Sequence, residues 1–377
     1  MSQQERKLNQ RSGVLICGAY GMSNAGDEAI LEAIVAEMRS IDPDMPITVL
    51  SRMPEATAQK HGVAALHMFD LFGFLKVMKR CRLYINGGGS LIQDVTSNRS
   101  LWYYLYTLRA AKRRGCKVMM YGCGIGPVNR PLNRRLAGRV INRNVDAISL
   151  RGERSLEELR AFGVTKPEII SAADPALFLP SASGEAVDAA MEQLGLEPNG
   201  NYFGLCVRRW NGMERKTQLF AAAADYAYET YGMQPVLLTV NSEQDRGVTE
   251  QVRAQIRVPC AAAEGQLSLG TMAGVIGRMR CVLAMRLHVL IFAASRAVPL
   301  AAVAYDPKVA SFLEDLDEHN MVDFEALNSP EQLYALIDAA ATADRAALEA
   351  ATARIMAQES RNVETARRLL EAAEKGQ

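Results

Sequence analysis

The chain has 377 residues, of which 49% are hydrophobic and 23% charged, with a formal net charge of +1. This length accommodates two domains that each bury a core, and the composition excludes disordered and fibrous proteins. Seven cysteines without a Cys-x-x-Cys pair, and four scattered histidines, exclude the usual spacings of a metal site and favour buried thiols of a reduced, cytoplasmic protein. The apolar stretch 281–305 contains Arg286, His288 and Arg296, so it does not predict a membrane span.

The first half of the chain predicts one doubly wound α/β domain. Residues 1–12 are polar and predict a disordered leader, not an export signal. From residue 13, short apolar runs alternate with amphipathic helical patterns, which is typical of βαβ units. The predicted strands are 14–18, 47–51, 83–86, 118–122 and 147–150, and the predicted helices include 27–39, 101–114 and 155–162. We place this domain at 13–178.

A break rich in Pro, Gly and Ser follows, and residues 179–200 are predicted to be a linker with one short helix. The pattern then restarts in a second domain, 201–328. Its predicted strands are 202–207, 236–240, 281–284 and 300–304, with a helix at 218–231. Ser329-Pro330 is a helix start, so 329–377 is predicted to be a helical arm. The fold class is therefore α/β, with two Rossmann-like domains and a cleft between them.

Positive charge is concentrated in the first domain. Between Lys76 and Arg154 there are seventeen Lys and Arg residues but three Asp and Glu residues. Such a block indicates an anionic partner, although solvated helix faces would account for many of these residues. The segment Met68–Arg82 adds apolar and aromatic residues to four of the cations. That mixture suits a membrane surface or, alternatively, a helix that packs its apolar face on the sheet.

Three glycine-rich segments follow predicted strands of the first domain, at 18–27, 86–90 and 122–127. Glycine lets backbone N–H groups approach a ligand, and ligands of open α/β sheets bind at the carboxyl ends of strands. Tight strand-to-helix turns use glycine for steric reasons as well. The first segment has neither the spacing of a dinucleotide fingerprint nor a Walker lysine. Asp27 is a candidate for catalysis and also for the cap of the helix that it begins.

Arginines end several predicted strands: Arg151 in the first domain, and Arg208, Arg209 and Arg286 in the second. A single arginine at such a place is usually a surface ion pair. Several together favour an anionic substrate, because guanidinium binds phosphate and carboxylate bidentately. His288 lies between Arg286 and Lys308 in the pattern, and a titratable imidazole among cations suits a phosphoanionic substrate that needs acid–base help.

These residues together resemble the polysaccharide pyruvyl transferase family. The resemblance extends over roughly residues 13–315 and rests on motifs in the expected order: Gly21 with Asn24-x-Gly26-Asp27-Glu28, Asn86–Gly89, Gly124-x-Gly126-Pro127, Ser149-x-Arg151, Asp174-Pro175, Arg286-Leu287-His288 and Tyr305–Lys308. The most similar subgroup is the bacterial enzyme that pyruvylates N-acetylmannosamine in cell-wall polymers that anchor S-layer proteins. The resemblance implies a fold similar to glycosyltransferase B, with an acceptor-side first domain and a donor-side second domain.

The resemblance also implies the reaction: pyruvyl transfer from phosphoenolpyruvate to a sugar as a ketal, with phosphate released. We expect catalysis from His288, Arg151 and Lys308, and donor binding by Arg286, Leu287 and Arg208. The candidates for acceptor binding are Asn24, Asp27, Gly87, Gly88, Gly89, Gly124 and Gly126. This chemistry needs no metal and no cofactor beyond phosphoenolpyruvate as co-substrate. The expected acceptor is a glycan, which can be carried on a lipid diphosphate.

Two other functions stay open. A nucleotide-sugar glycosyltransferase of the same fold commonly carries a glutamate before a Gly-x-Pro turn, whereas 289–299 contains no acid. A non-catalytic glycan- or anion-binding protein has no use for an imidazole among cations. We expect a cytoplasmic protein with peripheral contact to the anionic inner membrane face, and no nucleic acid partner.

Overall fold

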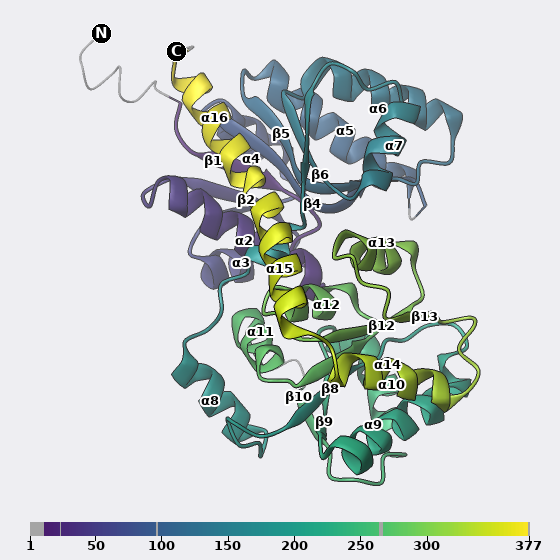
Figure 1. Cartoon of the computed structure of the whole chain (residues 1–377). Helices are drawn as coiled ribbons and strands as arrows, with labels where there is room; N and C mark the ends of the chain where they lie inside the picture. Colours follow the sequence, from purple (N-terminus) through teal and green to yellow (C-terminus); the bar gives the residue numbers. More distant parts are fainter. Residues whose placement is uncertain (1–10, 23, 96, 264–266, 376–377) are drawn as a thin grey trace. The chain divides into compact units, whose positions relative to one another are not determined.

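The computed structural model describes residues 11–22, 24–95, 97–263 and 267–375 (Figure 1). The chain divides into two compact units: unit 1 is formed by the chain up to Pro175 together with the segment from Ala357, and unit 2 is Ala176–Met356. Each unit is built on a parallel sheet with helices on both faces, so the α/β fold class is confirmed.

Unit 1 contains a seven-stranded parallel sheet in the order β3-β2-β1-β4-β5-β6-β7. The strands are β1 (Val14–Cys17), β2 (Ile47–Ser51), β3 (Ala64–His67), β4 (Leu83–Ile92), β5 (Lys117–Ile125), β6 (Ala147–Arg151) and β7 (Glu168–Ala172). The helices are α2 (Ala25–Ile41), α3 (Pro54–His61), α4 (Leu71–Met78), α5 (Asn98–Arg113), α6 (Pro131–Asn144), α7 (Glu153–Ala161) and α16 (Arg361–Lys375). Helices α4 to α7 share one apolar core on one face of the sheet, and α16 lies beside α2 and contacts β4 to β7.

Unit 2 contains a six-stranded parallel sheet in the order β10-β9-β8-β11-β12-β13. The strands are β8 (Tyr202–Cys206), β9 (Gln234–Leu238), β10 (Ala261–Ala263), β11 (Cys281–Ala284), β12 (Leu300–Ala304) and β13 (Met321–Asp323). The helices are α8 (Gly184–Gln193), α9 (Thr217–Tyr231), α10 (Ser242–Arg253), α11 (Leu269–Gly277), α12 (Leu287–Ala294), α13 (Pro307–Asp315), α14 (Pro330–Ala341) and α15 (Arg345–Glu359). The last residues of α15 belong to unit 1.

The strands differ from the expectation in two ways. Strand β4 continues through the segment 86–90 and β5 continues to Ile125, so these glycine-rich segments lie in the sheet and not in turns, except for Gly126-Pro127, which follows β5. Pairing with β1 ends at Asn86, so pairing with β5 alone outweighs the poor strand propensity of glycine there, and the register shifts between Gly89 and Ile92. Strands β3, β7, β10 and β13 were not predicted, because they are short strands at or next to the sheet edges without a long apolar run.

The unit boundaries also differ from the expected domain limits. The segment expected as a linker contains α8, which packs on α11 within unit 2. The expected C-terminal arm is divided: α14 packs on α9 in unit 2, and the chain from Ala357 belongs to unit 1. Arg11 and Ser12, expected in the disordered leader, pack on unit 1, where Arg11 Nη1 donates to Cys81 O at 3.2 Å. The rest of that leader lies outside the described residues.

The C-terminal segment is anchored to unit 1 by polar contacts. Arg368 forms two hydrogen bonds of 2.7 and 2.8 Å with Glu168, and Asn362 Nδ2 donates to Ala173 O at 3.0 Å. Beneath it, the carboxyls of Glu37 and Glu359 are both buried, each with a side chain about 1% exposed. Burial, and then the charge of Glu359, raises the pKa of Glu37 well above its usual range, and burial raises the pKa of Glu359 to about 7.

Candidate active site

Each sheet has a point where the strand order reverses, and it lies beside the first strand of the unit. In unit 1 this point lies between β1 and β4, and in unit 2 between β8 and β11. The helices that follow such strand pairs leave on opposite sides of the sheet, which opens a crevice at the carboxyl ends, where open α/β sheets bind ligands. The candidate residues of the sequence lie in or directly after these strands and the strands that follow them in each sheet, β5, β6 and β12.

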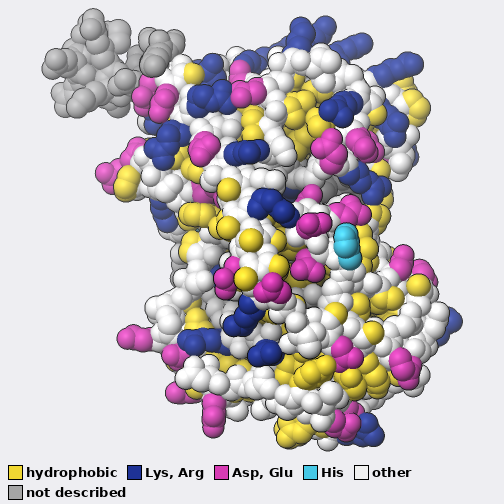
Figure 2. Space-filling model, viewed as in Figure 1, with side chains coloured by type: hydrophobic (Ala, Val, Ile, Leu, Met, Phe, Trp, Pro, Cys, Tyr) yellow, Lys and Arg dark blue, Asp and Glu magenta, His cyan; other side chains and the backbone are white. Residues whose placement is uncertain are grey.

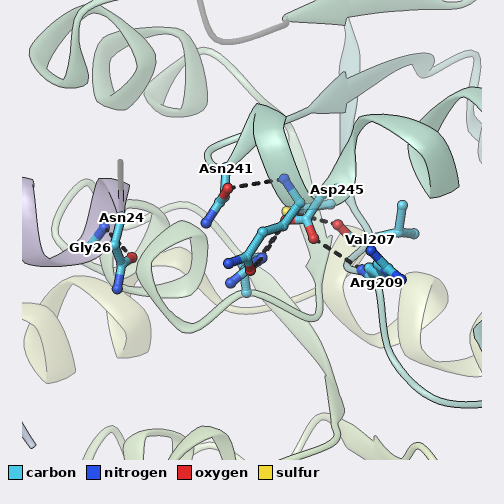
Figure 3. Close-up of polar contacts among 9 residues, drawn as sticks. Asn24, Gly26, Val207, Arg209, Asn241 and Asp245 are labelled. Atoms are coloured by element: carbon cyan, nitrogen blue, oxygen red, sulfur yellow. Dashed lines mark hydrogen bonds and ion pairs between the residues drawn. The ribbon is translucent and has the colours of Figure 1, made fainter. Parts of the chain in front are cut away.

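In unit 1, the loop after β1 is held by its own hydrogen bonds. Asn24 caps α2, and its Oδ1 accepts from Gly26 N at 3.2 Å (Figure 3). The Nδ2 of Asn24 lies 2.5 Å from Asp27 Oδ2. Glu28 Oε1 accepts from Gly21 N at 2.7 Å. Burial opposes ionisation of Glu28, but hydrogen bonds from His61 and Gly21 outweigh it and lower its pKa. Capping of α2 therefore comes from Asn24, and Asp27 is its hydrogen-bond partner.

The glycines of β4 serve mainly to let other groups approach the strand. A Cβ on Gly87 would lie 2.6 Å from the Tyr20 hydroxyl, and one on Gly88, whose φ is +38°, would lie 2.0 Å from an Ile30 methyl group. A Cβ on Gly89 would lie 3.0 Å from Asp27 Oδ1, so the structure brings these two candidates together. Gly87 and Gly88 thus have a packing function, whereas Gly89 adjoins the carboxylate.

A second group of unit 1 candidates lies at the ends of β5 and β6. Arg151, the last residue of β6, forms an ion pair with Asp174, and both side chains are largely buried. A Cβ on Gly124 would lie 2.7 Å from Ser90 Oγ and 3.4 Å from Arg151 Nε, so the bare backbone of Gly124 makes room for both. Ser90 is exposed and was not a candidate. Gly126 instead packs against a glutamate of α7.

In unit 2, Arg208 leaves the carboxyl end of β8 and stacks on two aromatic rings. Its guanidinium carbon lies 4.3 Å from the ring centre of Tyr305 and 5.2 Å from that of Trp210. The two rings are 4.8 Å apart at their centres. Arg208 Nε is buried and has no hydrogen-bond partner within the described part of the chain. Burial raises the pKa of Tyr305, and the nearby Arg208 charge moderates this shift. The cation–π contacts fix the plane of the guanidinium.

Arg286, after β11, is held by a buried carboxylate. Asp245 Oδ2 accepts from Arg286 Nε at 2.7 Å and lies 2.6 Å from its Nη2, while Asp245 Oδ1 accepts from Arg209 N at 3.0 Å (Figure 3). The Asp245 side chain is 1% exposed and that of Arg286 is 14% exposed. Gln244 Oε1 accepts from Arg286 Nη2 at 3.3 Å, and the Asn241 side chain accepts from Gln244 N. Asp245 therefore connects the ends of β8 and β11.

His288 is the second residue of α12, two positions after Arg286 in the sequence, and it is half-buried. Leu287, between them, is 6% exposed and packs into the unit. Lys308 is the second residue of α13, where Asp306 caps the helix; its side chain is 50% exposed and its Nζ lies 3.5 Å from Asp306 Oδ2. Because β8, β11 and β12 are neighbours, the residues that follow them share one edge of the sheet.

The structure thus places all three expected donor residues, Arg208, Arg286 and Leu287, in unit 2. Two residues that sequence reasoning missed hold the arginines: Asp245 contacts Arg286, and Trp210 stacks on Arg208. Asp245 lies within a polar helix with no motif around it, and Trp210 lies in a loop, so neither gave a signal in one sequence. Among the residues that the structure describes, no group of three or more His, Cys, Asp or Glu side chains could hold a metal ion. No described helix is both long and apolar enough to cross a bilayer.

Solved structures with similar folds are distant in sequence. UDP-GlcNAc 2-epimerase from Methanocaldococcus jannaschii has a TM-score of 0.63 at 13% identity, covering 88% of this chain and 93% of that one. Anabaena HepE in complex with UDP and glucose has a TM-score of 0.59 at 12% identity, covering 94% and 99%. The Escherichia coli ADP-heptose lipopolysaccharide heptosyltransferase II has a TM-score of 0.51 at 13% identity, covering 87% and 98%. These likenesses show the two-domain fold of glycosyltransferase B.

A search of curated proteins found no match. The sequence does match the family model described as polysaccharide pyruvyl transferase over residues 24–307, about three quarters of the chain. That range contains Asn24 and the start of α2 with Asp27, the glycine-rich strands, the Arg151–Asp174 pair, and Arg286 with His288. The chain belongs to the polysaccharide pyruvyl transferase family.

Proposed function

We propose that this protein transfers the pyruvyl group of phosphoenolpyruvate to a sugar of a cell-wall glycopolymer precursor and forms a pyruvate ketal. The observation that carries the proposal is the set of groups at the switch point of unit 2, where Arg208 follows β8, and Arg286 and His288 follow the neighbouring β11 at the same edge of the sheet. Family membership supports pyruvyl transfer to a polysaccharide.

The donor carries a carboxylate and a phosphate, and each is a planar or tetrahedral anion that guanidinium groups bind well. Arg286 is oriented by Asp245 and Arg208 is oriented by two rings, so both are organised before a ligand arrives. Pre-oriented cations spend little conformational entropy on binding. We assign donor binding to Arg286, Arg208 and Leu287, and we assign a catalytic role to Arg151 of unit 1, as expected from the sequence.

The chemistry begins with a proton. His288 delivers it to the methylene carbon of phosphoenolpyruvate, which makes C2 electrophilic. A sugar hydroxyl forms a bond to C2, the bond between C2 and the phosphate oxygen breaks, and phosphate leaves with the electron pair. A second hydroxyl of the same sugar then closes the ketal. One hydroxyl proton replaces the proton that His288 gave, and the other leaves with phosphate. Lys308 stabilises the departing phosphate.

We assign acceptor binding to unit 1. Asp27, which contacts Asn24 and adjoins Gly89, would bind sugar hydroxyls, and Gly124 would leave room for the sugar. The proposed acceptor sugar is N-acetylmannosamine of a polymer that anchors S-layer proteins, carried on a lipid diphosphate. The reaction as written uses phosphoenolpyruvate as its co-substrate and requires no metal ion. Both substrates of this proposal are made in the cytoplasm, where we place the reaction.

A nucleotide-sugar glycosyltransferase is the second candidate, because relatives of this fold have been solved with UDP bound. It is the weaker candidate, because α12 and the turn after it carry no acid that could bind a ribose. Purified protein is incubated with phosphoenolpyruvate or UDP-sugars and a panel of sugars, and released phosphate is measured. Phosphate release that needs phosphoenolpyruvate and an acceptor supports pyruvyl transfer. Consumption of a UDP-sugar in the absence of phosphoenolpyruvate would establish the second candidate.

A further inference from the structure

The outer face of unit 1 formed by α4, α5 and α6 is basic, and its acids, Asp70 and Asp94, lie at the helix starts, where Asp70 caps α4 and Asp94 accepts hydrogen bonds from Arg130 N and Asn133 Nδ2. By sequence, none of these three helices has an Asp or Glu residue. Their exposed cations are Lys76, Arg99, Arg109, Arg113, Arg135, Arg139 and Arg143. In Figure 2, dark blue side chains gather along the margin of unit 1 where Figure 1 shows α5 and α6. A surface with one sign of charge attracts an anionic partner.

The same face exposes large apolar side chains. Phe72 is 90% exposed, Leu132 is 77% exposed and Trp102 is 50% exposed. The expected packing of α4 on the sheet is met by Phe74 and Met78, which are buried, and it leaves Phe72 to solvent. Leu71, Tyr106 and Leu136 complete the exposed set. Large apolar groups that are exposed in several neighbouring elements mark an interaction surface.

The three helices form one continuous face. Leu75 of α4 lines a shallow hollow together with Tyr106 and Arg113 of α5. Trp102 Nε1 of α5 donates to Asn133 Oδ1 of α6 at 3.1 Å. All three helices connect parallel strands on the same face of the sheet, so they run in the same direction.

The large exposed apolar residues lie toward the helix starts, whereas exposed cations continue to the helix ends. In α5, Trp102 and Tyr106 precede Arg109 and Arg113 on one exposed stripe. Leu71 and Phe72 begin α4 and precede Lys76, and in α6 Leu132 and Leu136 come before Arg139 and Arg143. The face therefore has an apolar band at the helix starts, which also contains Arg99 and Arg135, and a basic band behind it. The helix starts lie at the carboxyl edge of the sheet, where the candidate residues of unit 1 are found.

We propose that the α4–α6 face docks on an anionic lipid bilayer, with the apolar band in the acyl boundary and the basic band at the headgroups. Interfacial amphipathic surfaces combine aromatic and leucine side chains with Lys and Arg in this way. Each basic residue near an anionic surface strengthens binding about fivefold. Docking of this kind would hold the carboxyl edge of unit 1 near the membrane plane, within reach of a lipid-linked acceptor.

The test uses the full chain and needs no turnover, so its failure is distinct from failure of the proposed reaction. The sequence has two tryptophans, and Trp210→Phe leaves Trp102 as the sole reporter. Fluorescence is followed on titration with vesicles of phosphatidylglycerol and phosphatidylcholine whose acyl chains are brominated. We expect a blue shift and quenching of Trp102 that phosphatidylcholine vesicles alone do not produce, and that weaken with salt because the screening length is about 8 Å at physiological ionic strength.

Matched variants separate the two bands. Arg109→Gln with Arg113→Gln and Arg139→Gln should weaken co-sedimentation on the order of a hundredfold. The same three-charge loss in unit 2, Arg253→Gln with Arg345→Gln and Arg354→Gln, should not.

Phe72→Ser with Leu132→Ser should abolish quenching at all salt concentrations, whereas Tyr228→Ser, at a residue 37% exposed in unit 2, should leave it unchanged. Equal binding to neutral vesicles would overturn the proposal. The proposal would also be overturned if the vesicles did not quench Trp102 and RNA released the protein from anionic vesicles. That result would assign the α4–α6 face to nucleic acid binding.

Discussion

Asp245→Asn removes the negative charge that holds Arg286 while leaving the size of the side chain unchanged. The carboxylate accepts from Arg286 Nε at 2.7 Å and from Arg209 N at 3.0 Å, and its side chain is 1% exposed. Losing one partner of a buried ion pair costs about 3–5 kcal/mol. Arg286 is 14% exposed and regains some hydration, so we expect a loss near 3 kcal/mol, at the lower end of that range.

For a unit of this size, that loss lowers the melting temperature by about 6–12 °C. The released guanidinium also binds the donor less well. A charge-assisted hydrogen bond is worth about 1.5–3 kcal/mol, so the KM for phosphoenolpyruvate should rise roughly 10- to 100-fold, with a smaller change in kcat.

The assay is phosphate release in Asp245→Asn, Arg286→Gln and the double variant, together with thermal unfolding of each. If the pair acts as one unit, the double variant is little worse than either single variant, and the coupling energy is about 2 kcal/mol. If the free-energy changes of the two single variants add up to that of the double variant within about 0.5 kcal/mol, Asp245 is not a positioning residue for Arg286.

Three further outcomes follow from the site and the fold. His288→Ala should lower phosphate release by about 10²–10⁴-fold with an unchanged melting temperature, and near wild-type turnover would contradict its proton-transfer role. Arg286→Ala should raise the KM for phosphoenolpyruvate more than it lowers kcat, as steady-state kinetics will show; an unchanged KM would remove Arg286 from the donor site. Glu359, whose pKa is raised from 4.5 to about 7, keeps a proton in the folded state that the unfolded state loses, so stability falls as pH rises across that interval. Glu359→Gln should therefore stabilise the protein at pH values above about 7 and have little effect near pH 4.5, as measured by denaturant unfolding. An equal change in the free energy of unfolding at both pH values would contradict the raised pKa of Glu359.

The fold class could be predicted because the central strands are continuous apolar runs. Val14–Cys17 and Cys281–Ala284 are buried along their whole length, and such runs are typical of parallel sheets covered on both faces. The edge strand β7 alternates between exposed and half-buried residues and has no such run. Pairing with β6 makes it a strand, and that information is not local in sequence.

The glycine-rich segments show where local rules fail. A strand prediction ends at Asn86 because glycine disfavours strands, yet β4 continues to Ile92 through three glycines. Two of these glycines are required by Ile30 and Tyr20, which come from another part of unit 1. The motif was found from sequence, but its packing role depends on contacts that only the folded chain reveals.

Some residues of the candidate site could be predicted from the sequence, and Asp245 could not. Arg208, Arg286 and His288 stood out because strongly polar residues end apolar strands, which is a signal in the sequence itself. Asp245 lies about forty residues from Arg286 and in a polar helix, so nothing local distinguished it from the other acids. Its role comes from the order of strands β9, β8 and β11, which brings the two side chains to one edge.

The central claim is that phosphoenolpyruvate is the donor, and a direct binding and product experiment tests it. Calorimetric titration with phosphoenolpyruvate, UDP and UDP-sugars is combined with mass spectrometry of an N-acetylmannosamine acceptor after incubation. We predict that phosphoenolpyruvate binds more tightly than UDP and that the acceptor gains the mass of pyruvate less one water. Tighter binding of UDP, with an acceptor mass that grows by a sugar only when a UDP-sugar is supplied, would contradict it.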